Sequence, residues 1–242
     1  FSCLPMNKVK LHTLWLLGML FLMTACGDDD DYYYPSVKLE FVTVKAGADG
    51  LIQSLLPDKG ELLTVAKDRT GSTISPNSAR RVISNYEVNP EDATAVIYSL
   101  QSVVAPEPKG ADDPAFEGGL KYDPVDVTSI WLGRDYLNMI LNVKININSG
   151  KQHVFGMIEE SVEVEGDETV VTLSLFHDAN GDEENYNRRA YISVPLTKYV
   201  DEENPHQTIR IKFKYHTTDK NGVVVESSKY CDPGFEYVPG VN

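Results

Sequence analysis

Cysteine is scarce in this chain, with only Cys3, Cys26 and Cys231 among 242 residues. Cys3 lies before an apolar N-terminal segment and Cys26 lies just after it, so the rest of the chain carries a single thiol. A single thiol has no partner for an internal disulfide, which excludes the disulfide-stapled scaffolds of small secreted domains. We therefore expect the folded part to depend on hydrophobic cores, with Cys231 packed rather than reactive.

Catalytic signatures are also missing. The sequence contains no H-E-x-x-H, G-x-S-x-G, P-loop or G-x-G-x-x-G motif. His153, His177, His206 and His216 are scattered without short-range pairing, so we expect them to be solvated or packed. The many carboxylates gather around expected turns, and no pair stands out for glycoside hydrolysis. These absences predict a protein that is not an enzyme and that uses no cofactor.

Positive charge is in short supply. The chain has 22 Lys and Arg residues against 36 Asp and Glu residues, a net charge of −14. Without Lys8 and Lys10, which lie in the N-terminal segment, the net charge is −16. Such a charge opposes nucleic-acid binding and favours a cationic partner.

The one long apolar run extends from Thr13 to Met23 and follows Lys8 and Lys10. A basic start followed by a run of this length is typical of a secretory signal, because a membrane-spanning helix needs about 20 apolar residues. Residues 1–5 fit no part of such a signal, and we expect them to play no part in the fold. Residues 1–25 are therefore assigned to upstream residues and the signal peptide.

The residues that end this segment, Met23-Thr24-Ala25-Cys26, resemble a bacterial lipobox, in which the cysteine is acylated and the signal is cut before it. The resemblance implies that Cys26 carries two or three palmitate-type chains, each buried methylene contributing about 0.8 kcal/mol to membrane binding. The alternative is a soluble secreted protein that is cut after Ala25.

Four aspartates, Asp28, Asp29, Asp30 and Asp31, follow almost directly. Because like charges repel each other, we expect residues 26–36 to form an extended, solvated tether. An acidic run at this place also resembles the signal that sends lipoproteins of Bacteroidetes to the outer leaflet of the outer membrane. The resemblance implies a lipid-anchored protein on the cell surface, with retention in the periplasm as the alternative.

From residue 37 onward the apolar pattern has a period of two, which is typical of strands. Strand-forming runs occur in VKLEFVTVKA, GELLTVAKD, RRVISNYEV and ATAVIYSLQSVV. In the first run the alternation shifts at Val42, after Phe41, which favours a β-bulge. Five short strands over residues 37–106 suit a small barrel, because closure removes exposed sheet edges. The Pro- and charge-rich residues 107–116 are predicted to be a linker.

Residues 117–238 alternate more cleanly. Two runs place every second residue on one apolar face: Leu141, Val143, Ile145 and Ile147 in the first, and Ile209, Ile211, Phe213 and Tyr215 in the second. We expect hairpin turns at NSGK, within HDANGDEE and at DKNG. The pattern predicts an antiparallel β-sandwich with Trp131 in its core, and an all-β fold for the chain.

Three segments, SIWLGRDYLNMILNVKI, HDANGDEENYNRRAYISVPL and IRIKFKY, together resemble the NigD-like lipoproteins of Bacteroidetes. The resemblance extends over essentially the whole chain after the signal. It implies an N-terminal OB domain followed by a C-terminal β-sandwich, and it supplies no catalytic or binding residues. The family is named after a gene set associated with bacteriocin production, which implies a role in immunity.

One loop has the beginning of a metal-binding pattern. In HDANGDEE, the residues Asp178, Asn180 and Asp182 occupy alternate positions, as the first ligands of a calcium loop do. The sixth position is Glu183 instead of glycine, and the twelfth is Arg189 instead of a bidentate glutamate. An ordinary polar hairpin loop is therefore favoured over a calcium site, and we predict no metal.

The function predicted from these observations is non-enzymatic binding at the cell surface. The bacteriocin association makes a secreted toxin peptide the expected ligand, and the net negative charge favours a cationic one. The alternative is a glycan-binding accessory protein of polysaccharide uptake, since small barrels and sandwiches also bind oligosaccharides through aromatic side chains.

Overall fold

The computed structural model describes residues 37–166, 168–182, 186–205 and 207–240. The predictions for the signal peptide, Cys26, the four aspartates and His206 lie outside these ranges. No helix within them is long and apolar enough to cross a membrane. The described residues form strands and two short 3₁₀ turns, Pro114–Phe116 and Thr197–Tyr199, which confirms the predicted all-β class.

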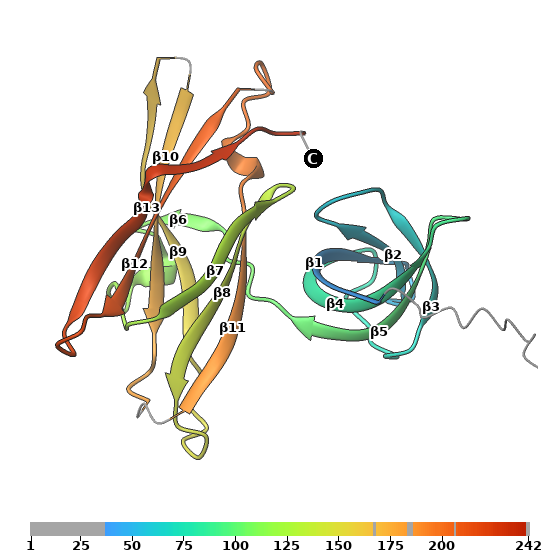
Figure 1. Ribbon diagram of the computed structural model, residues 1–242, viewed down its shortest axis with the longest axis horizontal. Coiled ribbons are helices and arrows are strands. Elements are labelled where there is room, and N and C mark those ends of the chain that lie inside the picture. Colours follow the sequence, from blue (N-terminus) through green and yellow to red (C-terminus); the bar gives the residue numbers. More distant parts are fainter. Residues whose placement is uncertain (1–36, 167, 183–185, 206, 241–242) are drawn as a thin grey trace, which may run out of the picture. The chain divides into compact units, whose positions relative to one another are not determined.

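Five strands form a closed barrel in the order β1-β2-β3-β5-β4 (Figure 1). They are β1 (Val37–Ala46), β2 (Ile52–Pro57), β3 (Leu63–Asp68), β4 (Ala79–Asn89) and β5 (Thr94–Ser102). Neighbouring strands of the barrel pair antiparallel, except β3 and β5, which pair in parallel. The small barrel expected from the period of two is confirmed, and closure leaves no strand of it without two neighbours.

Strand β1 buries both of its faces. Val42 and Val44 point into the barrel, where they pack in the same cluster as Leu55, Tyr86 and Ile97. Phe41 packs outside the barrel core, in a separate cluster with Ile83 and Val103. The predicted bulge at Val42 is wrong: the register of β1 against β4 is regular, and its shift against β2 comes only between Lys45 and Ala46. The change in alternation arises because neighbouring residues face two different apolar surroundings.

Eight strands form the sandwich, in two sheets (Figure 1). One sheet has the order β13-β12-β10-β9-β6 and the other β11-β8-β7. Their bounds are β6 (Pro108–Gly110), β7 (Asp126–Gly133), β8 (Tyr136–Ile145), β9 (Val154–Glu165), β10 (Glu168–Asp178), β11 (Tyr186–Pro195), β12 (Ile209–Thr218) and β13 (Val224–Tyr237). Strand β6 lies inside the predicted linker, so part of that segment belongs to the sandwich.

The sandwich core follows the alternation read from the sequence. Its largest cluster contains Ile209, Ile211, Phe213 and Tyr215 from β12, as predicted, and Leu141 and Val143 from β8. Ile145 is only partly buried, and Ile147 lies beyond the end of β8 with 64% of its surface exposed. The predicted apolar face is therefore correct within the strand and fails where the strand ends.

Two of the three predicted hairpins are wrong. The NSGK turn joins β8 to β9, and the HDANGDEE segment leads from β10 towards β11, but in each case the two strands belong to different sheets. The DKNG turn does join the antiparallel neighbours β12 and β13. Because the chain leaves one sheet after β10 and returns at β12, these two strands pair in parallel, so the sandwich is not wholly antiparallel.

A buried polar cluster joins the barrel to the sandwich. Arg81 on β4 pairs with Asp58 at 2.5 Å and donates to Asn138 Oδ1 at 3.1 Å and to Ser193 Oγ at 2.9 Å. Asn138 Nδ2 donates to the second oxygen of Asp58 at 2.7 Å, and Ser193 Oγ donates to Asn138 Oδ1 at 2.6 Å. The guanidinium also lies 4.1 Å from the ring centre of Tyr136. Each charge and amide in this Arg81 cluster therefore has a partner from the other domain.

The close approach of the two domains also depends on a small residue. A Cβ atom at Gly133, the last residue of β7, would collide with the Asp58 carboxylate and the Asn138 amide. Next to it, Arg134 donates to the carbonyl oxygens of Pro57 at 3.2 Å and Gly60 at 2.7 Å. The β7–β8 turn thus fits against the end of β2 because position 133 has no side chain and Arg134 bonds to the carbonyl oxygens there.

We expect Arg81→Ala to lower the free energy of unfolding by about 3 kcal/mol, because removing one member of a buried ion pair leaves the other charge unpaired. For a chain of this size the melting temperature should fall by about 6–12 °C. The matched control is Arg80→Ala, at an exposed neighbour on β4, which should change stability by less than about 0.5 kcal/mol. Equal melting temperatures for the two variants would contradict the role given to the cluster.

Candidate functional site

A cleft of about 600 Å³ lies where the barrel meets the sandwich. We call it the apolar groove. Its walls come from β1 and β4 of the barrel and from β7, β8 and β11 of the sandwich, and their main apolar side chains are Leu39, Phe41, Ile83, Trp131, Ile140 and Tyr191. Its size falls within the range of small-molecule and peptide-anchor pockets.

The floor of the apolar groove is aromatic. Phe41 meets Trp131 edge-on, with ring centres 5.3 Å apart, and Tyr191 at 6.2 Å. Trp131 is only partly buried in this cluster, so its predicted place in the core of the sandwich is wrong. It lies on the sandwich surface that faces the barrel. Leu39, which also lines the groove, keeps 70% of its surface exposed.

A second cleft of about 790 Å³, the polar groove, adjoins the first. The two share the lining residues Gln101, Arg189 and Tyr191. The polar groove lies along β11, an edge strand of its sheet, and along the loop from Asn146 to His153 that precedes β9. The apolar and polar grooves therefore form one continuous surface along the sandwich.

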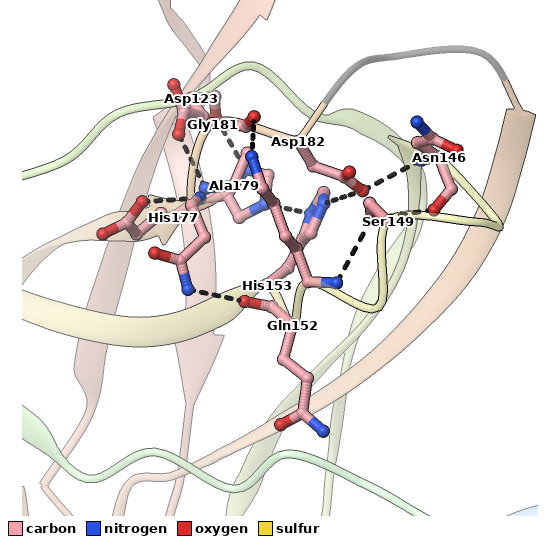
Figure 2. A network of polar contacts seen from close by, with 12 residues as sticks. Asp123, Asn146, Ser149, Gln152, His153, His177, Ala179, Gly181 and Asp182 are labelled. Atoms are coloured by element: carbon pink, nitrogen blue, oxygen red, sulfur yellow. Dashed lines mark hydrogen bonds and ion pairs between the residues drawn. The ribbon is translucent and has the colours of Figure 1, made fainter.

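The loop that lines the polar groove is held by a histidine network, drawn in Figure 2. His177 on β10 packs against its cross-strand neighbour Phe155 with ring centres 4.6 Å apart. His153 Nδ1 lies 3.0 Å from His177 Nε2, and its other nitrogen lies 3.4 Å from Asp182 Oδ2. Two histidines that are far apart in the sequence are thus in contact, because the pairing of β9 with β10 brings positions 153 and 177 together.

The partners of these rings decide where the protons lie. His177 Nδ1 is 2.9 Å from the carbonyl oxygen of Asp123, which only accepts, so this nitrogen must donate. In neutral His177 the Nε2 atom is then an acceptor, and His153 Nδ1 must donate to it. The other nitrogen of His153, Nε2, faces the Asp182 carboxylate.

The surroundings shift the pKa values in the directions that this arrangement needs. Burial lowers the pKa of His177, and the neighbouring His153 lowers it further. Hydrogen bonds from the Ser149 side chain and the Asn146 N–H lower the pKa of Asp182. A neutral His177 and an ionised Asp182 therefore hold the loop at Asn146 against the segment that follows β10.

The residues of the calcium pattern are used within the protein. Asp178 Oδ1 accepts from the Asn180 N–H at 2.7 Å, and Asn180 Nδ2 donates to the Gln152 carbonyl oxygen at 3.2 Å. Asp182 Oδ2 accepts from the Asn146 N–H at 2.9 Å. Within the described ranges no group of three His, Cys, Asp or Glu residues could hold a metal ion. Asn180 and Asp182 connect this segment to the loop before β9, and Asp178 stabilises the turn itself.

Two other singled-out residues are packed. Cys231 is half-buried, its thiol points to the Phe213 carbonyl oxygen at 3.5 Å, and burial raises the pKa of this thiol. His216 lies with its ring centre 4.6 Å from that of Tyr122. Neither residue lines the two grooves.

The depressed pKa of His177 predicts a stability that falls in mild acid. Below the ordinary histidine pKa of about 6.5 the unfolded chain takes up a proton that the folded site resists, so unfolding is favoured as the pH falls. Between pH 7.5 and 5.5 the melting temperature should decrease, and His177→Gln should reduce this decrease. An unchanged pH dependence in the variant, measured by thermal unfolding, would contradict the assignment.

The fold defines a two-domain β protein, in which a five-stranded barrel precedes a sandwich and a groove runs between them. The chain belongs to the NigD-like family. The model of the NigD-like N-terminal OB domain matches residues 41–103, and that of the NigD-like C-terminal β-sandwich domain matches residues 109–227. This confirms the resemblance and identifies the barrel as an OB domain.

Solved structures with this fold come from related bacteria. A NigD-like immunity protein from Bacteroides caccae is 70% identical, with a TM-score of 0.77, over 86% of this chain and 100% of that one. A protein of unknown function from Bacteroides vulgatus shares 18% identity over 86% of this chain and 96% of its own, with a TM-score of 0.60. A proposed lipoprotein from Bacteroides fragilis shares 11% identity over 80% and 96%, with a TM-score of 0.54. No curated protein matches.

Proposed function

We propose that this chain is a non-enzymatic lipoprotein, anchored on the surface of the outer membrane through Cys26, that protects its cell by binding a secreted toxin peptide. The apolar groove is the observation that supports it most. The name of the relative from Bacteroides caccae, a NigD-like immunity protein, points to the same kind of ligand.

The apolar groove has the features of a binding surface for a peptide. Trp131, Phe41 and Tyr191 are rigid aromatic side chains of the kind that dominate the energy of interfaces. Because the Arg81 cluster holds both walls, the groove is formed before a ligand arrives, and little conformational entropy is lost on binding. A peptide that places one large apolar side chain beside Leu39 would bury surface that is otherwise exposed.

The histidine network supports binding rather than catalysis. His153 and His177 direct three of their four ring nitrogens at each other and at the Asp123 carbonyl, and the fourth at Asp182. A general base must reach a proton of its substrate, and here both rings are committed to protein groups. Their role is to position the loop that lines the polar groove.

The anchor is tested by Cys26→Ser. Without acylation the chain loses the two or three buried acyl chains that hold it, and it should move from the membrane fraction to the soluble fraction. Cys231→Ser makes the same chemical change at a packed thiol and should leave fractionation unchanged. A Cys26→Ser chain that stays with the membrane at the wild-type level would contradict the anchor.

Surface exposure is tested on whole cells. Added protease should degrade the wild-type chain, and replacing Asp28 to Asp31 by asparagine, which removes the charge and keeps the length, should protect it. Protection of the wild-type chain itself would place it in the periplasm.

The immunity role is tested by deleting the gene. The producer should become sensitive to its own bacteriocin while its growth on polysaccharides stays the same. Reintroducing the gene with the change Trp131→Ala should protect the cell poorly. Loss of an aromatic side chain that contributes about 2 kcal/mol to binding weakens affinity roughly 30-fold. The matched control, Leu62→Ala, removes a side chain that is 58% exposed and lies outside both grooves. Unchanged sensitivity after deletion, or a defect in sugar growth alone, would contradict immunity.

A further inference from the structure

The charge of the grooves is opposite to the charge of the chain. Although the chain carries a net charge of −14, the residues that line the two grooves include Lys59, Lys151, Arg188 and Arg189. Among the described residues two carboxylates line them, Asp58 and Glu40, both in the apolar groove. Asp58 is already neutralised by Arg81. The excess of positive charge is therefore local to the grooves.

Most of these cations have no carboxylate partner among the described residues. Lys59, Arg188 and Arg189 are exposed and make no hydrogen bond or ion pair there. Lys151 Nζ donates to the carbonyl oxygen of Gly181, a contact that leaves its charge uncompensated. Other exposed lysines of the chain are unpaired too, but these four line one continuous surface.

Three cations elsewhere in the sandwich have acidic partners. Lys198 pairs with Glu159 at 2.6 Å, Arg210 with Glu168 at 2.7 Å, and Lys214 with Glu160 at 2.8 Å. A chain with more acids than bases can supply such partners readily. The uncompensated charges along β11 therefore leave room for a carboxylate from a ligand.

The apolar wall and the cations lie side by side. Arg189 lines both grooves, and in the apolar groove it shares the lining with Trp131 and Leu39. On β11, the neighbours Arg188 and Arg189 leave opposite faces of the strand; Arg188 lines the polar groove alone, and Arg189 lines both grooves. Guanidinium groups bind carboxylates through two parallel hydrogen bonds, which favours arginine at such places.

We propose that the ligand of this surface is an acidic, amphipathic peptide segment, whose apolar side chains enter the apolar groove and whose carboxylates pair with Arg188 and Arg189. This inference rests on the proposed peptide-binding function and replaces the cationic peptide expected from the net charge. At physiological ionic strength charges are screened over about 8 Å, so the cations in the groove act on a bound peptide more strongly than distant acids do.

The experiment uses two synthetic ten-residue peptides with Leu and Phe at the same five positions and either Glu or Lys at the other five. The protein is the chain from residue 27 onward, in which Trp131 is the single tryptophan, so its fluorescence reports on the apolar groove. The peptide with Glu should change this fluorescence and bind at least about tenfold more tightly than the peptide with Lys.

Charge reversal at the groove supplies the matched comparison. Arg189→Glu should weaken binding of the acidic peptide at least about tenfold and strengthen binding of the basic one. Arg80→Glu, an exposed change of the same kind on β4 outside both grooves, should alter neither. Because both arginines are exposed, the two variants should keep the wild-type melting temperature, which separates lost binding from lost folding.

Several results would overturn the inference. They are tighter binding of the basic peptide, equal loss with both variants, no binding of either peptide, or binding of polygalacturonate in place of the acidic peptide. Each leaves the immunity test by gene deletion standing on its own. If gene deletion causes no sensitivity while the acidic peptide still binds, the immunity role is wrong, but the proposal of an acidic peptide ligand stands.

Discussion

The pairing of Arg81 with Asp58, completed by Asn138 and Ser193, is the constraint on which the rest of the structure depends. Two of these residues come from the barrel and two from the sandwich. A buried charge is costly to leave unpaired, so the pair is satisfied only when both domains are in place. The cluster therefore selects one relative position of the domains more than it adds stability of its own.

That position creates the apolar groove. Phe41 belongs to the barrel, and Trp131 and Tyr191 belong to the sandwich, yet their rings meet only because the domains are held together. The same strand that lines the barrel core with Val42 and Val44 offers Phe41 on its outer face. One strand of ten residues thus serves the stability of the barrel and the shape of the groove.

The histidine network plays a similar part for the polar groove. His153, His177 and Asp182 connect the loop before β9 with the segment after β10, at the end of the sandwich where the chain changes sheets. Such crossing segments have no strand partner to hold them. Side-chain hydrogen bonds hold these segments in place of strand pairing. The shape of the polar groove therefore depends on the protonation of the histidine network.

The sequence by itself determined the strands, the division into two β regions and the residues of the sandwich core, as the alternation of Ile209, Ile211, Phe213 and Tyr215 illustrates. These features are readable because the side-chain period of a strand is local, and burial of one face follows from it. The motifs of the chain also indicated its family.

Only the tertiary structure decided which strands share a sheet, and this is why the turns at NSGK and HDANGDEE were misread as hairpins. It also moved Trp131 from the expected core to the groove and brought His153 to His177. Arg81, Asp58, Asn138 and Ser193 lie up to 135 positions apart in the numbering and carry no pattern between them. Contacts of this kind arise from the packing of distant segments, which no local period records.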